Sequence, residues 1–137
     1  MEYKENALTY DIYCKLRKSI GWSDLPKTKA ENAIKSSIYT VTVFDNKNAV
    51  GMARLIGDGI YYIIVDVIVQ PNYQRKGIGS NIIKMIIDFV SRETPAGGRS
   101  SIQLISEKDK EAFYKQFGFK TIPHEFCGSG MRKVIHK

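Results

Sequence analysis

The sequence predicts an α/β fold with a mixed, mostly antiparallel central sheet flanked by helices. Short β-branched and aromatic runs follow one another between residues 38 and 69, with turn residues between them, which is typical of antiparallel neighbours. A long amphipathic segment then separates the apolar run 60–69 from another at 101–106, as in a strand–helix–strand unit. Because 137 residues suit one hydrophobic core, we expect a single domain over residues 1–137.

The N-terminal elements are expected to be an edge strand, two helices and a pair of strands. Residues 2–6 could form the edge strand, and apolar residues recur at the helical interval over 8–20. A weaker helix is expected over 27–36. The β-branched and aromatic residues of 38–44 and 49–56, with turn residues between them, predict an antiparallel pair.

The next element is an almost continuously apolar run at 60–69. A strand with no polar face is predicted to lie centrally, covered on both sides. A glycine-containing loop follows, and the apolar residues of 78–90 then form one wide helical face.

Four short elements are expected to complete the chain. Residues 101–106 read as a strand and 109–117 as a short helix. Two closing strands are expected at 119–122 and 131–135.

The composition favours a globular protein whose surface has a mild preference for anions. Hydrophobic residues make up 43% of the chain, and the net charge is +7. The positive charge is spread evenly, which favours a solvated surface or an anionic small ligand over a nucleic acid. No apolar run approaches the roughly 20 residues that span a bilayer, and no secretory signal opens the chain. We therefore expect a cytoplasmic protein that binds neither membrane nor nucleic acid.

The two cysteines and two histidines are isolated in the sequence. Neither Cys14 nor Cys127 has a second cysteine at metal-ligand spacing or a close histidine partner. We therefore predict no metal site.

The strand–loop–helix segment at 67–80 is the most informative part of the sequence. Backbone N–H groups at a helix N-terminus are unpaired and carry partial positive charge, so such a junction can hold a phosphate. Gly77 and Gly79 let a ligand approach the backbone, and Arg75 and Lys76 attract anions.

Two common phosphate motifs are excluded at this segment. A dinucleotide fingerprint beginning at Gly77 would need a small residue where Ile82 stands. A P-loop needs its lysine after the last glycine, whereas Lys76 precedes Gly77.

A third motif is matched, because Gln74-Arg75-Lys76-Gly77-Ile78-Gly79 resembles the Q/R-x-x-G-x-G/A acetyl-coenzyme A signature of the GNAT superfamily of N-acetyltransferases. A second segment, Phe113-Tyr114-Lys115-Gln116-Phe117-Gly118-Phe119, is similar to the F-Y-x-x-x-G-F element that closes the coenzyme site in that family. The resemblance covers nearly the whole chain. It implies the GNAT-like acyl-CoA N-acyltransferase fold, with acetyl-CoA as cosubstrate and no metal.

The resemblance also implies a coenzyme site. The strand would hold the pantetheine arm, and the loop and helix N-terminus would hold the pyrophosphate. The residues implied in coenzyme binding are Val67, Ile68, Val69, Gln74, Arg75, Lys76, Gly77, Ile78, Gly79 and Ser80. Many relatives have an asparagine at the position of Glu107, so this chain departs from the family pattern there.

Two residues are candidates for catalysis. Tyr114 stands at the family's thiolate-protonating position, and packing beside neighbouring phenylalanines is the alternative role. Asp66 interrupts the apolar strand close to the expected thioester. It could accept the proton of the amine, or it could only hydrogen-bond a backbone amide where the strands separate.

The function implied is direct transfer of an acetyl group from acetyl-CoA to a primary amine of a small molecule or a protein. The alternative is a catalytically inactive, coenzyme A-binding regulatory or interaction domain. Candidate acceptor-pocket residues, on topology alone, are Trp22, Tyr61, Tyr62 and Glu125. Terminal strands could also pair two copies through an edge, which would give a homodimer.

Overall fold

Five strands form one sheet in the order β1-β2-β3-β4-β5. The structure, a computed structural model, describes all residues 1–137. Its elements are β1 (Glu2–Glu5), α1 (Tyr10–Ser19), α2 (Lys27–Lys35), β2 (Tyr39–Asp45), β3 (Asn48–Gly57), β4 (Tyr61–Val69), the 3₁₀ turn η1 (Pro71–Tyr73), α3 (Ile78–Glu93), β5 (Ser101–Leu104) and α4 (Glu111–Lys115). Strands β1 to β4 pair antiparallel and β5 pairs parallel with β4. The predicted fold class, a mixed and mostly antiparallel sheet flanked by helices, is confirmed.

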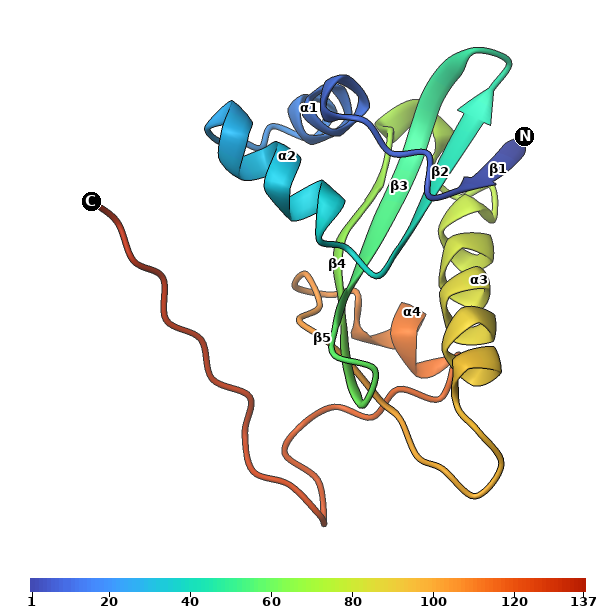
Figure 1. Cartoon of the computed structure of the whole chain (residues 1–137), viewed down its shortest axis with the longest axis vertical. Coiled ribbons are helices and arrows are strands. Elements are labelled where there is room, and N and C mark those ends of the chain that lie inside the picture. The colour runs from blue at the N-terminus through green and yellow to red at the C-terminus, as the bar shows by residue number, and fades with distance from the viewer. The chain divides into compact units, whose positions relative to one another are not determined.

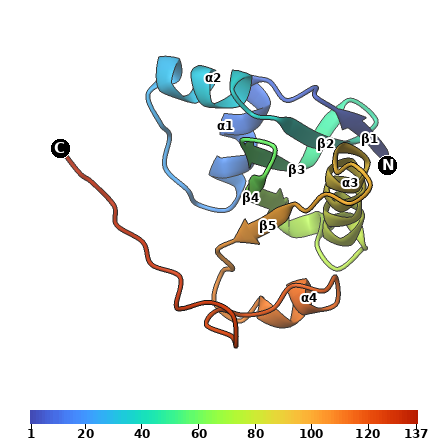
Figure 2. The same cartoon turned by 60° about the horizontal axis from the view of Figure 1, so that its bottom comes forward.

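The chain divides into two compact units, residues 1–105 and residues 106–137. The first unit contains the whole sheet, with α1 and α2 on one face and α3 on the other (Figures 1 and 2). The second unit contains α4. Each unit is described separately below.

Each face of the sheet buries its own apolar layer. On the α1 face, one cluster of buried side chains joins the two helices to β3 and β4: Leu8, Tyr13, Leu16, Ala30, Met52 and Ile68. On the α3 face, the helix buries Ile82, Ile83, Ile86 and Val90, and the ring of Phe89 stacks on that of Tyr39 at 4.3 Å between centroids. The wide apolar face predicted for this helix therefore covers the sheet.

A bulge in β4 changes which residues share a face. The pairing with β3 shifts between the partners Arg54–Val65 and Met52–Ile68, and Asp66 adopts a left-handed φ of +54°. An extra residue in one strand of a pair produces this kind of kink. As a result, both Val65 and Ile68 lie on the α1 face although they are three positions apart in the chain. In a regular strand, residues three positions apart lie on opposite faces.

The prediction that β4 is covered on both faces is wrong for its first half. Tyr61 and Ile63 lie on the α1 face and are 60% and 39% exposed, whereas Tyr62 and Ile64 are buried on the α3 face. An apolar side chain shows only that a residue can be buried, and helices α1 and α2 do not cover this end of the sheet (Figure 1).

The two closing strands predicted at residues 119–122 and 131–135 are not formed. In the unit of residues 106–137, the only β interaction is a single bridge between His124 and Cys127. Met131 and Ile135 are 94% and 74% exposed. Alternating apolar residues favour a strand, but a strand exists only where its backbone groups pair with a neighbour, and these segments have none.

Candidate functional site

The β4–α3 junction leaves the start of α3 open. Arg75 and Gly77 both have left-handed φ angles, +62° and +82°, which turn the chain sharply before the helix begins at Ile78. No side chain caps the helix, although Gly77 accepts the first helical hydrogen bond, from the N–H of Asn81 at 3.1 Å. The remaining first-turn N–H groups are thus directed outward with the positive end of the helix dipole.

Packing beneath the junction is unusually close. A Cβ placed on Gly51 of β3 would meet the carbonyl oxygen of Ile68 at 3.3 Å and the side chain of Ile78 at 3.4 Å. By contrast, a Cβ on Gly77 would meet nothing within 4 Å. The first turn of α3 is therefore anchored on its inner side and open on its outer side.

Three contacts order the loop that carries the basic residues. The Tyr73 hydroxyl donates to Asp45 Oδ2 at 2.6 Å, and Gln74 Nε2 donates to the Val69 carbonyl at 3.0 Å. Lys76 Nζ lies 5.3 Å from the centroid of the Tyr73 ring. Arg75 and Lys76 are both exposed, so their charges are available to an anion at the helix N-terminus.

The outer edge of β4 is open beside this junction. Pairing with β5 runs only from Tyr61 to Ile64, whereas pairing with β3 continues to Val69. Residues 65–69 consequently lack a partner strand on the β5 side. An extended ligand could pair with main-chain groups there, as a strand would.

A buried group of charged side chains surrounds the bulge on the α1 face. Asp66 Oδ2 accepts hydrogen bonds from the Tyr13 hydroxyl at 2.7 Å and from Arg54 Nε at 2.9 Å. Asp66 Oδ1 lies 3.5 Å from a terminal nitrogen of Arg17. We call Tyr13, Arg17, Arg54 and Asp66 the Asp66 cluster. The side chains of its three charged members are only 11–13% exposed.

The contacts of Asp66 favour a structural role over that of a base, since both oxygens already face cationic donors. The structural role expected from sequence was a hydrogen bond to a backbone amide, whereas the partners of Asp66 are side chains. Burial raises the pKa of the Tyr13 phenol, and its hydrogen bond to Asp66 raises this pKa further. Tyr13 therefore stays protonated and remains a donor to Asp66 around neutral pH.

Tyr114 lies in the unit of residues 106–137, in a small aromatic group. Its ring packs edge to face with Phe113 at 5.0 Å and with Phe119 at 6.1 Å between centroids. Burial raises the pKa of Tyr114, and the nearby Glu107 carboxylate raises it further. The phenol thus holds its proton at neutral pH. These contacts are compatible with both roles expected from sequence, proton donor and packing residue.

The other acceptor candidates fall in different environments. Tyr61 is exposed on the α1 face, and Tyr62 is buried on the α3 face. The ring of Trp22 lies 5.1 Å from the guanidinium carbon of Arg17. Glu125 is exposed in the second unit.

Sequence reasoning missed three members of the Asp66 cluster, Tyr13, Arg17 and Arg54. Arg54 is the one that carried a usable signal, because it is a lone charge in the apolar run of β3. A buried charge requires a partner, and Asp66 is the only charge in the apolar strand β4. Pairing these two would have located the cluster.

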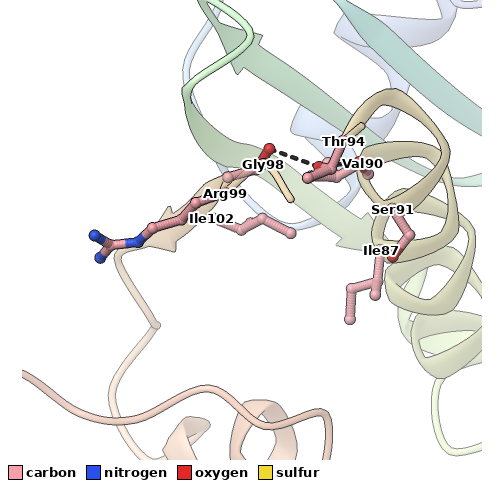
Figure 3. Close-up of a pocket in the computed structure, with 8 residues that line it drawn as sticks. Ile87, Val90, Ser91, Thr94, Gly98, Arg99 and Ile102 are labelled. Atoms are coloured by element: carbon pink, nitrogen blue, oxygen red, sulfur yellow. Dashed lines mark hydrogen bonds between the residues drawn. The ribbon is translucent and has the colours of Figure 1, made fainter. Parts of the chain in front are cut away.

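A pocket of about 470 Å³ lies elsewhere, between the C-terminal end of α3 and the chain leading into β5 (Figure 3). Ile87 and Val90 of α3 line one side and Ile102 of β5 lines the other. Thr94 Oγ1 and Ser100 Oγ share a hydrogen bond of 2.6 Å across it. It contains none of the predicted site residues, and the residues predicted to bind the coenzyme phosphates lie at the opposite end of α3.

The structure has neither a metal-binding group nor a membrane-spanning helix. No three of the His, Cys, Asp and Glu side chains are grouped closely enough to hold a metal ion. None of the helices combines the length and apolar character needed to cross a bilayer.

A glycine junction at a helix N-terminus, next to an open strand edge in a mostly antiparallel sheet, agrees with the acetyltransferase class that the sequence motifs predict. Residues 20–135 match the family model of the acetyltransferase (GNAT) domain, and the chain belongs to this family. The resemblance found in the sequence is thereby confirmed.

Individual relatives agree with this assignment. The uncharacterized N-acetyltransferase ycf52 of Pyropia yezoensis is 33% identical over 106 residues, which are 74% of this chain; the match spans 59% of that protein's length. A crystal structure from meticillin-resistant Staphylococcus aureus, of a protein of unknown function called a "Probable Acetyltransferase", is 28% identical with a TM-score of 0.82 and covers 96% of this chain and 98% of its own. An aminoglycoside 6'-N-acetyltransferase, solved in complex with coenzyme A, is 16% identical with a TM-score of 0.58 over 68% of this chain and 57% of its own; it shares the fold.

Proposed function

We propose that this acetyltransferase takes its acetyl group from acetyl-CoA and transfers it directly to a primary amine of a small molecule or a protein. The observation that carries the proposal is the uncapped start of α3 beside the open edge of β4. A solved member of the fold was obtained with coenzyme A, which supports coenzyme binding here. The proposal covers the activity, the cosubstrate and the acceptor class together.

The described residues suit two parts of the coenzyme, its pyrophosphate and its pantetheine arm. The unpaired N–H groups of Ile78, Gly79 and Ser80 would receive the pyrophosphate, with Arg75 and Lys76 adding positive charge. Room for the ligand exists over Gly77, where even a Cβ would meet nothing. The main chain of residues 67–69 would pair with the amides of the pantetheine arm.

When bound, acetyl-CoA supplies an activated acetyl thioester. Holding that thioester and a neutral amine in line lowers the barrier by replacing a chance encounter with a fixed geometry. Tyr114 would donate its proton to the departing thiolate sulfur as the new C–N bond forms and the C–S bond breaks. Its raised pKa keeps that proton in place at neutral pH. The amine loses one proton to water as it becomes the amide, and Tyr114 regains a proton from water, so no residue is assigned as the general base.

The assay that tests the proposal measures thiol release from acetyl-CoA with a panel of primary amines. We expect turnover with at least one amine class. Tight coenzyme A binding without turnover on any amine would instead support the inactive binding domain, for which the departure at Glu107 is the sequence argument.

The role of Tyr114 is tested with Tyr114→Phe, which keeps the ring packing and removes the hydroxyl. We expect kcat to fall by roughly 10²-fold or more, as for loss of a general acid, with coenzyme A affinity unchanged. Phe113→Leu serves as the control for disturbed packing in the same aromatic group. Undiminished turnover of Tyr114→Phe would leave Tyr114 as a packing residue.

A further inference from the structure

The two arginines of the Asp66 cluster differ in how many of their N–H groups have hydrogen-bond partners. Arg54 donates from Nε to Asp66 and from a terminal nitrogen to the carbonyl of Ala33 at 3.1 Å and the hydroxyl of Ser37 at 3.0 Å. Arg17 donates to the carbonyl of Ser23 at 3.0 Å, and its contact with Asp66 is at the 3.5 Å limit. Its Nε is buried and has no partner. Arg17 is therefore the incompletely paired member.

The charges of the cluster do not balance. One carboxylate faces two guanidinium groups, and neither Arg17 nor Arg54 forms an ion pair with any other acidic residue. Taking a charge out of water costs free energy unless a counter-charge lies close by. The cluster therefore carries one positive charge in excess, and the weak pairing assigns it to Arg17.

Aromatic rings hold Arg17 in place. Its guanidinium carbon lies 5.5 Å from the centroid of Tyr13 and 5.1 Å from that of Trp22. The bond to Ser23 also ties it to the chain just after α1. A guanidinium oriented in this way is a ready-made donor for a carboxylate or a phosphate.

The position of Arg17 suits contact with the acceptor amine and not with the coenzyme phosphates. The start of α3 lies on the opposite face of the sheet from α1 (Figure 1). The Asp66 cluster lies on the α1 face, at the bulge where the open edge of β4 begins. An acceptor that approaches this edge from the α1 face passes Arg17.

We infer that the acceptor is a primary amine that also carries an anionic group, a carboxylate or a phosphate, and that Arg17 binds this group. The inference rests on the proposed function and adds the substrate class. Arg17 acts as a specificity residue: its charge selects among amines and takes no part in the transfer of the proton or the acetyl group.

The first test compares matched amines that differ in the anionic group. O-phosphoethanolamine is compared with ethanolamine, and β-alanine with β-alaninamide, by kcat/KM. We expect at least one anionic amine to exceed its neutral partner by roughly tenfold or more, the value of one charged hydrogen bond. Equal values within both pairs would overturn the inference. The two pairs also distinguish phosphate from carboxylate.

Substitution assigns the preference to Arg17. In Arg17→Gln we expect kcat/KM for the anionic amine and the ratio between the paired amines both to fall, the ratio to near one. Arg17→Lys retains the charge and should keep part of the preference. Lys18→Gln removes the same charge from the exposed neighbour on α1 and should change neither. A preference that survives in Arg17→Gln would contradict the inference.

A second test does not depend on turnover. The full chain, saturated with coenzyme A, is titrated with inorganic phosphate and separately with acetate, and the Arg17 Nε–H signal is followed by NMR. We expect one of the two anions to shift this signal in a saturable manner; Arg17→Lys, which has no Nε–H, serves to assign the signal. An unmoved signal with both anions would refute an anion site. If coenzyme A binds but no amine is acetylated, the proposed function fails and this titration alone decides the site.

Discussion

The two faces of the sheet around β4 are built in different ways. On the α3 face, the proposed anion-binding junction comes from one continuous segment, residues 74–80, and its donors would be backbone N–H groups. On the α1 face, the Asp66 cluster is drawn from α1, β3 and β4, and its donors are side chains; Tyr13 and Asp66 are 53 residues apart in the chain. The first site depends on local conformation, and the second depends on tertiary packing. Substitutions should therefore damage them differently.

The largest effect is expected when the central carboxylate of the α1 face is removed. In Asp66→Ala, two buried guanidinium groups lose their counter-charge, and such losses cost about 3–5 kcal/mol. Urea unfolding should show this decrease in the free energy of unfolding. Asp11→Ala, on the exposed first turn of α1, is the control and should cost well under 1 kcal/mol. A loss below about 1 kcal/mol in Asp66→Ala would show that the cluster contributes little to stability.

A smaller effect on stability, with a separate effect on binding, is expected at the junction. Gly77 and Gly21 share a φ of +82°, and a Cβ on either would meet nothing within 4 Å. Alanine at each position should therefore cost a similar amount, about 1–2 kcal/mol, through backbone strain alone. We expect only Gly77→Ala to weaken coenzyme A binding, as measured by calorimetry. Equal binding by the two variants would argue against a phosphate site at Gly77.

Removing the exposed charges of the loop should have a still smaller effect. Arg75→Gln and Lys76→Gln should each weaken coenzyme A binding by about two- to fivefold at low ionic strength, and by less as salt is added. The control is Lys47→Gln, in the exposed turn between β2 and β3. Binding that is independent of salt in the unmodified chain would count against an electrostatic contribution from this loop.

The smallest effect near neutrality concerns the Tyr13 phenol. Because burial and Asp66 raise the pKa of Tyr13, the folded chain holds this proton more tightly than the unfolded chain does. Its contribution to stability is complete below about pH 10 and is lost as the pH rises through the higher folded pKa. Stability measured from pH 9 to 12 should therefore fall less steeply in Tyr13→Phe. Part of the decline should remain, since the pKa of Tyr39 is raised as well.

The contrast between the faces also explains how much could be predicted from sequence. The elements around the junction were predictable because a buried strand, a glycine loop and an amphipathic helix are local patterns, and residues 67–80 form them. The participation of Tyr13 and Arg17 was not predictable, because nothing in α1 specifies that these side chains meet Asp66. The positive φ of Asp66 was hidden for the same reason: the bulge is set by pairing with β3.

The C-terminal segments show the opposite failure. Phe119 and Val134 belong to runs whose composition favours strands, yet neither run has a hydrogen-bonded neighbour. Both runs have residues that favour strands, but neither has a neighbouring strand with which to pair. The sequence pattern of a run does not show whether a neighbouring strand will pair with it.

The strand order has a consequence for how the chain folds. Because β1 to β5 are arranged in the sheet as they follow in the sequence, the paired strands β2, β3 and β4 are joined by short turns, and β5 returns through a single helical crossover. Contacts between segments close in sequence form faster than distant ones, since less loop entropy is lost. The hairpins can therefore form during synthesis, as soon as residues 39–69 have left the ribosome. Pairing of β1 with β2, across both N-terminal helices, and of β4 with β5, across α3, are the slower closures within the unit of residues 1–105.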